Sequence, residues 1–213
     1  MVTTVKSGRR ERRREQTRKR IFEAAMELFA KHGFPNVTVE QITEAADVGK
    51  GTFFNYFPNK DHLIIALTER QQELLNAAVS MAAKADSVRP VLFQLAHGLS
   101  AAPARSQLML RSLLGSILTN DIAHDRMRSL LASAREGLRV VMERGQTLGE
   151  LRRDISAQQL ARIFQTLVFG TNALWSLHPP TDLHLWMEQS VDFFWRAAAS
   201  GPADGGRKKG KLQ

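Results

Sequence analysis

Apolar side chains recur at helical spacing along almost the whole chain. The first stripe follows the i, i+3, i+4, i+7, i+8 pattern of one helix face: Ile21, Ala24, Ala25, Leu28 and Phe29. Gly33 then ends this helix, at a position where a C-terminal cap favours glycine. We find no alternating strand pattern flanked by hairpin turns and no internal repeat. The pattern therefore predicts an all-α fold with about nine helices.

Two short helices follow the first one. Thr38, with Gln41 three residues later, forms a capping box that opens a helix with an apolar inner face. Asp47-Val48-Gly49 breaks this helix, and a third helix is predicted from about Lys50 to Tyr56. Longer helices are predicted at about 60–84, 88–101, 103–119, 122–145, 156–177 and 182–199.

The third helix has an unusual outer face. Phe53 and Phe57 are four residues apart and can share a buried face. The other side then offers a cation, a hydroxyl, an aromatic ring, an amide and a phenol, from Lys50, Thr52, Phe54, Asn55 and Tyr56. Such groups read base edges, pack on thymine methyls and hold phosphates. Alternatively, Phe54 and Tyr56 pack on residues 60–65.

Gly51 costs this helix roughly 1 kcal/mol relative to alanine. Close approach of the backbone to another molecule is one reason to accept that cost. The outer face of the third helix is therefore a candidate DNA-reading surface.

The formal net charge of +9 is concentrated at the two ends of the chain. Residues 6–20 hold nine Lys and Arg against Glu11 and Glu15, and residues 201–213 hold four against Asp204. We expect the N-terminal segment to contact phosphate beside the DNA reader, which adds affinity without sequence information. The Gly-rich C-terminal segment is interpreted as a solubilising tail.

Several classes of function lack their motifs. Cysteine is absent, which excludes disulfides, a cysteine nucleophile and thiolate metal sites. We find no H-E-x-x-H, G-x-S-x-G, dinucleotide fingerprint or complete phosphate loop. Asp121, His124 and Asp125 could hold a metal, but a solvated helix start is the preferred interpretation. Because these motifs are missing, we expect a protein that is not an enzyme and has no cofactor. Because a signal peptide and an 18-residue apolar run are also missing, we expect it to be cytoplasmic.

The run from Thr38 to Lys60 resembles the N-terminal DNA-binding domain of the TetR family of bacterial transcription regulators. The resemblance covers about residues 16–65, and its most specific motif is the Gly-Thr-aromatic-aromatic run that ends in Phe57-Pro58-Asn59-Lys60. It implies contacts with the major groove from Lys50, Gly51, Thr52, Phe54 and Asn55, and with phosphates from Thr38, Tyr56 and Lys60. Members often carry tyrosine in place of Phe54, so contact with a thymine methyl becomes its expected role.

The resemblance also implies a C-terminal helical domain that binds a ligand and forms a dimer. The last two predicted helices are apolar on more than one face. The predicted dimer interface comprises Phe164, Leu167, Val168, Trp186, Val191 and Phe194, although these faces could instead fill an intramolecular core. The predicted effector cavity is mostly apolar and comprises Phe93, His97, Met109, Leu110, Arg111, Leu113, Leu114, Ile117, Phe169, Asn172 and Trp175. Taken alone, these are ordinary core residues.

The predicted organisation is a basic flexible arm (1–15), a helix-turn-helix DNA-binding domain (16–62), a ligand-binding and dimerisation domain (63–200) and a flexible basic tail (201–213). The implied function is a homodimeric repressor that binds a palindromic DNA operator and is released by a small hydrophobic effector. Two alternatives stay open. One is an architectural DNA-binding protein without sequence preference, and the other is a helical ligand-binding or catalytic protein with no DNA role.

Overall fold

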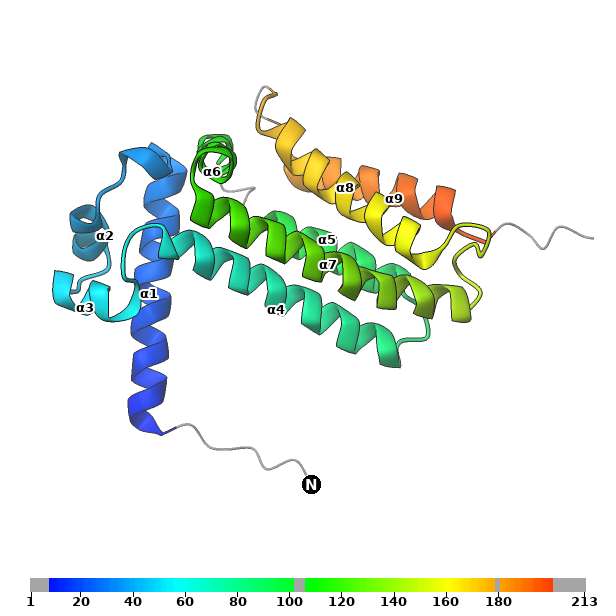
Figure 1. The fold of residues 1–213 in the computed structure, drawn as a ribbon, viewed down its shortest axis with the longest axis horizontal. Coiled ribbons are helices and arrows are strands. Elements are labelled where there is room, and N and C mark those ends of the chain that lie inside the picture. Colours follow the sequence, from blue (N-terminus) through cyan, green and yellow to red (C-terminus); the bar gives the residue numbers. More distant parts are fainter. Residues whose placement is uncertain (1–7, 102–105, 179–180, 201–213) are drawn as a thin grey trace, which may run out of the picture. The chain divides into compact units, whose positions relative to one another are not determined.

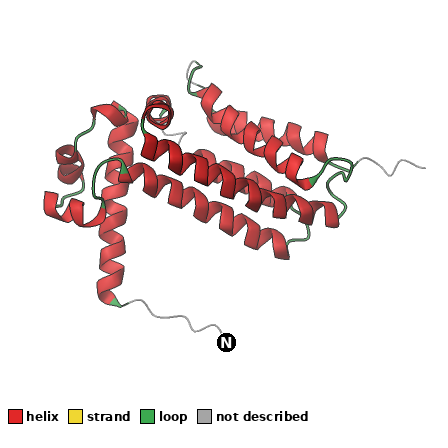
Figure 2. Cartoon of the chain, in the orientation of Figure 1, coloured by secondary structure: helices red, strands yellow, loops and turns green. Residues whose placement is uncertain are grey.

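The computed structural model describes residues 8–101, 106–178 and 181–200. Within these ranges all regular structure is helical, except for one β-bridge between Leu151 and Ala199 (Figure 1, Figure 2). The helices are α1 (Arg9–His32), η1 (Phe34–Asn36), α2 (Val39–Ala45), α3 (Lys50–Tyr56), α4 (His62–Lys84), α5 (Arg89–Ala101), α6 (Gln107–Thr119), α7 (Asp121–Thr147), α8 (Ala157–Trp175) and α9 (Leu183–Ala198). The described residues thus confirm an all-α fold, with η1 as a single 3-10 turn.

The start of α1 corrects the predicted flexible arm. Helix α1 begins at Arg9, so residues 9–15 are helical, while residues 1–7 lie outside the described part. Arginine, glutamate and glutamine are good helix formers, and no Pro or Gly follows Gly8 until Gly33. This extension is exposed and carries no apolar stripe, so the hydrophobic pattern could not detect it. The predicted tail at 201–213 lies outside the described residues.

The described chain divides into two compact units. The first comprises the described residues up to 71, together with 106–129 and those of 173–181. Its core joins α1, α2, α3 and the start of α4 through fully buried side chains, including Ile21, Phe29, Ile42 and Phe53.

Helix α6 belongs to this first unit. Met109 is fully buried in the same core, and the Phe34 N–H donates to the Ser112 hydroxyl at 3.0 Å. The predicted boundary at residue 62 is therefore corrected, because the DNA-binding helices share their core with a helix that is distant in sequence.

The second unit comprises residues 72–101 and 130–172 and the described residues from 182. Its core is formed by α4, α5, α7, α8 and α9, and includes Leu92, Val141, Phe164 and Phe194. Phe164 and Phe194 meet edge to face, with their ring centroids 5.2 Å apart. Helices α4, α7 and α8 each begin in one unit and end in the other.

Candidate nucleic-acid interface

Helix α3 is anchored by the aromatic side chains of its inner face. Phe53 and Phe57 are buried, and their ring centroids are 5.7 Å apart, as the i, i+4 spacing predicts. Phe54 is 51% exposed and contacts Phe53 with its ring at 5.4 Å, so it lies on the outside. Tyr56 is half-buried against the same core, so the packing alternative holds in part for Tyr56 but not for Phe54.

Local hydrogen bonds fix the approach to α3. The Thr38 hydroxyl accepts from the Gln41 N–H at 3.2 Å, and the Gln41 side chain accepts from the Thr38 N–H at 2.8 Å. This confirms the capping box. Asp47 has a φ of +50°, a left-handed conformation that aspartate tolerates better than most residues. Arg20 of α1 donates to the Asp47 carbonyl at 3.3 Å, so α1 holds the turn that aims α3.

The outer face of α3 presents polar groups that have no internal use. The side chains of Thr52, Asn55 and Tyr56 form no hydrogen bond within the described residues, and Asn55 is exposed. A Cβ built on Gly51 would meet nothing within 4 Å, so no neighbour in the described chain requires glycine there. The backbone at Gly51 is therefore open to an approaching molecule.

Lys50 lies on this outer face but has a partner. Its Nζ is 2.6 Å from Glu40 Oε1, and both side chains are more than half exposed. The Lys50 ammonium lowers the pKa of the Glu40 carboxyl from its ordinary value, mainly through this hydrogen bond. Without DNA, the predicted DNA contact Lys50 is therefore paired with the carboxylate of Glu40.

The structure corrects the predicted phosphate contact of Lys60. Its Nζ donates to the carbonyls of Phe34 at 2.9 Å, Pro35 at 3.3 Å and Val37 at 2.9 Å. These three bonds use all three ammonium donors, and the cation also lies 4.6 Å from the centroid of the Phe34 ring. Burial lowers the pKa of Lys60, and the negative charge of Asp61 partly opposes this shift. Lys60 therefore ties η1 to the residues before α4.

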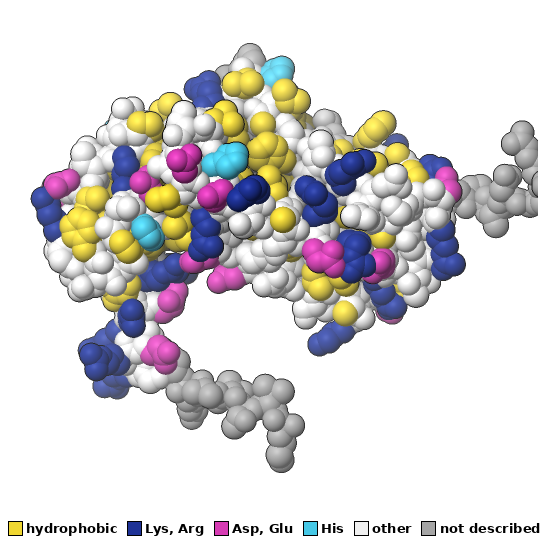
Figure 3. All heavy atoms as spheres, viewed as in Figure 1, with side chains coloured by type: hydrophobic (Ala, Val, Ile, Leu, Met, Phe, Trp, Pro, Cys, Tyr) yellow, Lys and Arg dark blue, Asp and Glu magenta, His cyan; other side chains and the backbone are white. Residues whose placement is uncertain are grey.

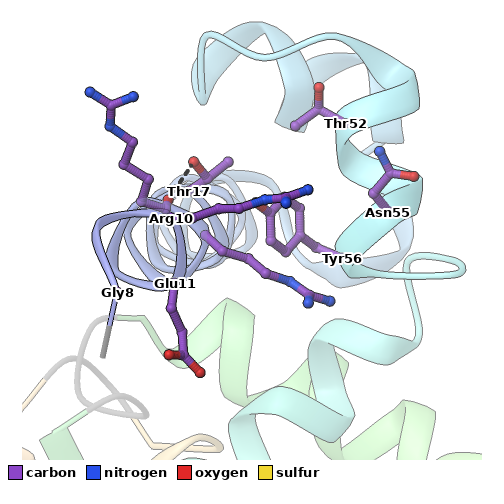
Figure 4. A pocket seen from close by; sticks show the side chains of 9 residues that line it. Gly8, Arg10, Glu11, Thr17, Thr52, Asn55 and Tyr56 are labelled. Carbon is purple, nitrogen blue, oxygen red and sulfur yellow. Dashed lines mark hydrogen bonds between the residues drawn. The ribbon is translucent and has the colours of Figure 1, made fainter. Parts of the chain in front are cut away.

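A groove of about 880 Å³ separates α3 from the N-terminal turns of α1 (Figure 4). Thr52, Asn55 and Tyr56 line one wall, and the other wall consists of Gly8, Arg10, Glu11, Arg13, Arg14 and Thr17. Lys and Arg side chains gather over this end of α1 (Figure 3). The five arginines between residues 9 and 14 are exposed and form no ion pair within the described chain. The hydrophobic pattern does not predict this groove, because residues 9–15 are helical without an apolar stripe.

The predicted ligand residues of the first unit are mainly packing residues. Met109 and Leu113 are buried in the core with α1, which corrects their assignment to a cavity. The Trp175 indole donates to the Thr181 carbonyl at 2.8 Å. Leu110 is buried, Leu114 and Ile117 are half-buried, and Arg111 is exposed.

Four further predicted ligand residues lie in the second unit. Phe93 and His97 line a groove of about 520 Å³ beside α9, where the His97 and His184 rings stack at 4.4 Å. Asn172 is buried and donates to the Val168 carbonyl at 2.8 Å, while its Oδ1 has no partner in the described chain. Phe169 is 41% exposed. The prediction therefore does not define one pocket.

The predicted dimer residues are largely internal. Phe164, Val168, Val191 and Phe194 are buried in the core of the second unit, and Leu167 packs partly against it. Trp186 is half-buried. These four buried side chains correct the prediction in favour of the intramolecular alternative. The exposed apolar residues of α8 and α9 in this unit are Ile163, Phe169, Leu185 and Phe193.

Residues 21–67 match the family model described as bacterial regulatory proteins, tetR family. That match covers α1 from its first apolar stripe, the capping box, the turn and α3, but not the turns of α1 that form the other wall of the groove. Residues 21–67 are therefore similar to this family of bacterial regulatory proteins, and the remainder of the chain lies outside the match.

A curated relative also matches part of the chain. The KstR repressor of Mycolicibacterium smegmatis is 39% identical over 70 residues, which is 33% of this chain and 34% of KstR. The match thus spans about a third of the length of this curated relative.

Solved structures cover more of the chain. Thermus thermophilus FadR, described as a TetR-family repressor in complex with lauroyl-CoA, is 28% identical, covers 89% of this chain and 100% of its own, and has a TM-score of 0.59. The complex of SmeT with triclosan, from Stenotrophomonas maltophilia, is 21% identical, covers 89% and 93%, and has a TM-score of 0.69.

None of the helices in the described ranges is both long and apolar enough to cross a membrane. Among the same residues, no group of three or more His, Asp or Glu side chains is placed to hold a metal ion. Asp125, one of the residues weighed for metal binding, pairs with Arg128 at 3.0 Å.

Proposed function

We propose that this chain is a homodimeric transcription repressor that reads a palindromic DNA operator with α3 and is released by a small hydrophobic effector. The observation that carries the proposal is the outer face of α3, on which Asn55, Thr52 and the open Gly51 backbone have no use inside the described chain. The similarity of residues 21–67 to a family of regulatory proteins supports the same role.

DNA reading would divide between two groups of residues. Asn55 and Thr52 would contact base edges in the major groove, and Phe54 would pack against a thymine methyl. Thr38, at the start of α2, and Tyr56 would contact phosphates, which fix the register of α3 on the duplex. Lys50 would reach DNA only after leaving Glu40.

Dimerisation would use the exposed side of α8 and α9. Leu185 and Phe193 are two turns apart on α9 and are 50% and 73% exposed. Apolar side chains in such an arrangement are typical of a surface that a partner covers. A two-fold dimer would present two α3 helices to the two half-sites of a palindrome.

An effector would act by binding one conformation of the dimer better than the other. The neighbours FadR and SmeT are described with lauroyl-CoA and triclosan. These two compounds are therefore suitable first probes. Asn172 is the candidate polar contact, because its buried Oδ1 has no partner in the described residues.

The proposal is tested by selecting genomic fragments with the purified protein and then measuring variants on the selected operator and on a random duplex. Asn55→Ala should weaken operator binding by about 1–3 kcal/mol and leave random-duplex binding unchanged. Asn76→Ala is the matched control, because Asn76 is also exposed on a helix but lies on α4. Equal losses on both duplexes would indicate an architectural DNA-binding protein, and no binding at low salt would refute a DNA role.

A further inference from the structure

We propose that the groove between the N-terminal turns of α1 and α3 binds one sugar–phosphate strand of duplex DNA. Arg10, Arg13 and Arg14 would hold phosphates from one wall, opposite Asn55 and Tyr56. This inference rests on the proposed function and adds a defined phosphate-binding site to the base-reading surface of α3.

The arginines of the extension do not all face the groove. The lining residues Arg10, Arg13, Arg14 and Thr17 follow i, i+3, i+4 and i+7, which is one face of a helix. Arg9 and Arg12 belong to the same exposed turns but do not line the groove. The extension therefore has a groove side and an outer side, both of which carry arginine.

The opposite wall offers neutral hydrogen-bonding groups. Asn55 and Tyr56 lie across from the turns of α1 (Figure 4), and their side chains form no hydrogen bond in the described chain. The Thr17 hydroxyl already donates to the Arg13 carbonyl at 3.0 Å, so it is not a free donor. Guanidinium groups facing amide and phenol groups suit an extended polyanion that also carries sugar oxygens.

The spacing of the arginines also suits a nucleic-acid strand. Arg10 and Arg14 are four residues apart, which is a rise of about 6 Å along the helix. Phosphates of one strand advance about 3.4 Å each along the duplex axis. Because the strand also winds around that axis, neighbouring phosphates lie farther apart than this rise, so a helix that follows the strand could place Arg10 and Arg14 beside neighbouring phosphates.

Glu11 is the one acidic side chain that lines the groove. It forms no ion pair within the described residues, and a phosphate strand in the groove would be repelled by its carboxylate. Substitution of Glu11 should therefore have the opposite sign to substitution of a groove arginine. Opposite effects of the Glu11 and arginine substitutions would also follow from net charge alone. A local site additionally requires that arginines on the groove side affect DNA binding more than arginines on the outer side.

The decisive comparison is between two double variants that remove equal charge from the same turns. Arg13→Gln/Arg14→Gln should reduce the slope of log affinity against log salt by about 1.8, which corresponds to two lost phosphate contacts. The fold-loss of affinity between 50 and 200 mM salt should then be about ten times smaller than in the unchanged protein. Arg9→Gln/Arg12→Gln should change the slope by much less. Circular dichroism should show that α1 remains helical in both. Glu11→Gln should tighten binding severalfold.

Both double variants are measured on the selected operator and on a random duplex. Phosphate contacts do not depend on the base sequence, so the change in salt slope should be the same on both duplexes. Phosphate-ethylation interference should lose one cluster of sensitive phosphates in Arg13→Gln/Arg14→Gln alone. Equal slope changes in the two doubles, or no change in either, would overturn the groove site. The proposed function would survive that result as long as Asn55→Ala still separates operator from random duplex.

Discussion

Glu40 of α2 and Lys50 of α3 form an ion pair, with Oε1 and Nζ 2.6 Å apart, that joins the exposed sides of the two helices. Lys50 is the first residue of α3 and a predicted contact with the major groove, so DNA must compete with this carboxylate for its ammonium. An exposed pair of this kind contributes little to folding. Its effect should therefore appear mainly in DNA binding.

We predict that Glu40→Gln strengthens binding to a random duplex about two- to fivefold and increases the salt slope by up to about one. In this variant the Lys50 ammonium has no ion pair to break before it contacts DNA. Fluorescence anisotropy at several salt concentrations measures both quantities. Glu44→Gln is the matched control, because Glu44 is exposed on the same helix without an ion pair in the described residues. An equal gain in the control would show that only net charge matters.

The same pair predicts a change in titration. Lys50 lowers the pKa of Glu40, so the ion pair persists above the ordinary carboxyl range and is lost as pH falls through the lowered value. In Lys50→Met the pKa of Glu40 should rise towards the ordinary value for glutamate, because its largest lowering contact is lost. Carboxyl-detected NMR of the free protein measures the midpoint. An unchanged midpoint would mean that the pair does not persist in solution.

Lys60 provides a prediction that separates folding from DNA contact. Lys60→Met would leave three carbonyls without their charged donor and should destabilise the fold by about 2–4 kcal/mol. Lys31→Met, at an exposed position in the last turn of α1, should cost less than about 0.5 kcal/mol. Urea unfolding of the two variants gives both values. A Lys60 variant with native stability but weak DNA binding would restore the phosphate role.

The sequence predicted most helix ends because their signals are local. Gly33 has a φ of +77° and ends α1, and the Thr38 capping box opens α2 as expected. The bonds of Lys60 were not predictable, because they depend on where the chain brings the carbonyls of Phe34 to Val37. The helical spacing separates Phe194 from Phe193 on α9, but it does not show which of the two faces packs inside the subunit and which one is left for a partner.

These two phenylalanines test the dimer surface. Phe193 is 73% exposed and Phe194 is 4% exposed, so Phe193→Asp should break a dimer while each subunit keeps its helical content. Phe194→Ala should instead destabilise the fold by about 3–5 kcal/mol, because it empties part of the core. Sedimentation velocity and thermal circular dichroism distinguish the two effects. A Phe193→Asp variant that still sediments as a dimer would place the interface elsewhere.

Gly51 should show a conflict between stability and function. Nothing in the described chain lies within 4 Å of a Cβ built there, so Gly51→Ala adds no clash and should stabilise α3 by up to about 1 kcal/mol. The added methyl would stand where the proposed interface brings the backbone close to DNA, so operator affinity should fall at least tenfold, or about 1.4 kcal/mol. Gly115→Ala in α6 is the control, because its Cβ position is equally open and lies away from α3. Both substitutions should raise the unfolding midpoint, and only Gly51→Ala should impair operator binding. If Gly51→Ala binds its operator normally, α3 does not approach DNA through its backbone at this residue.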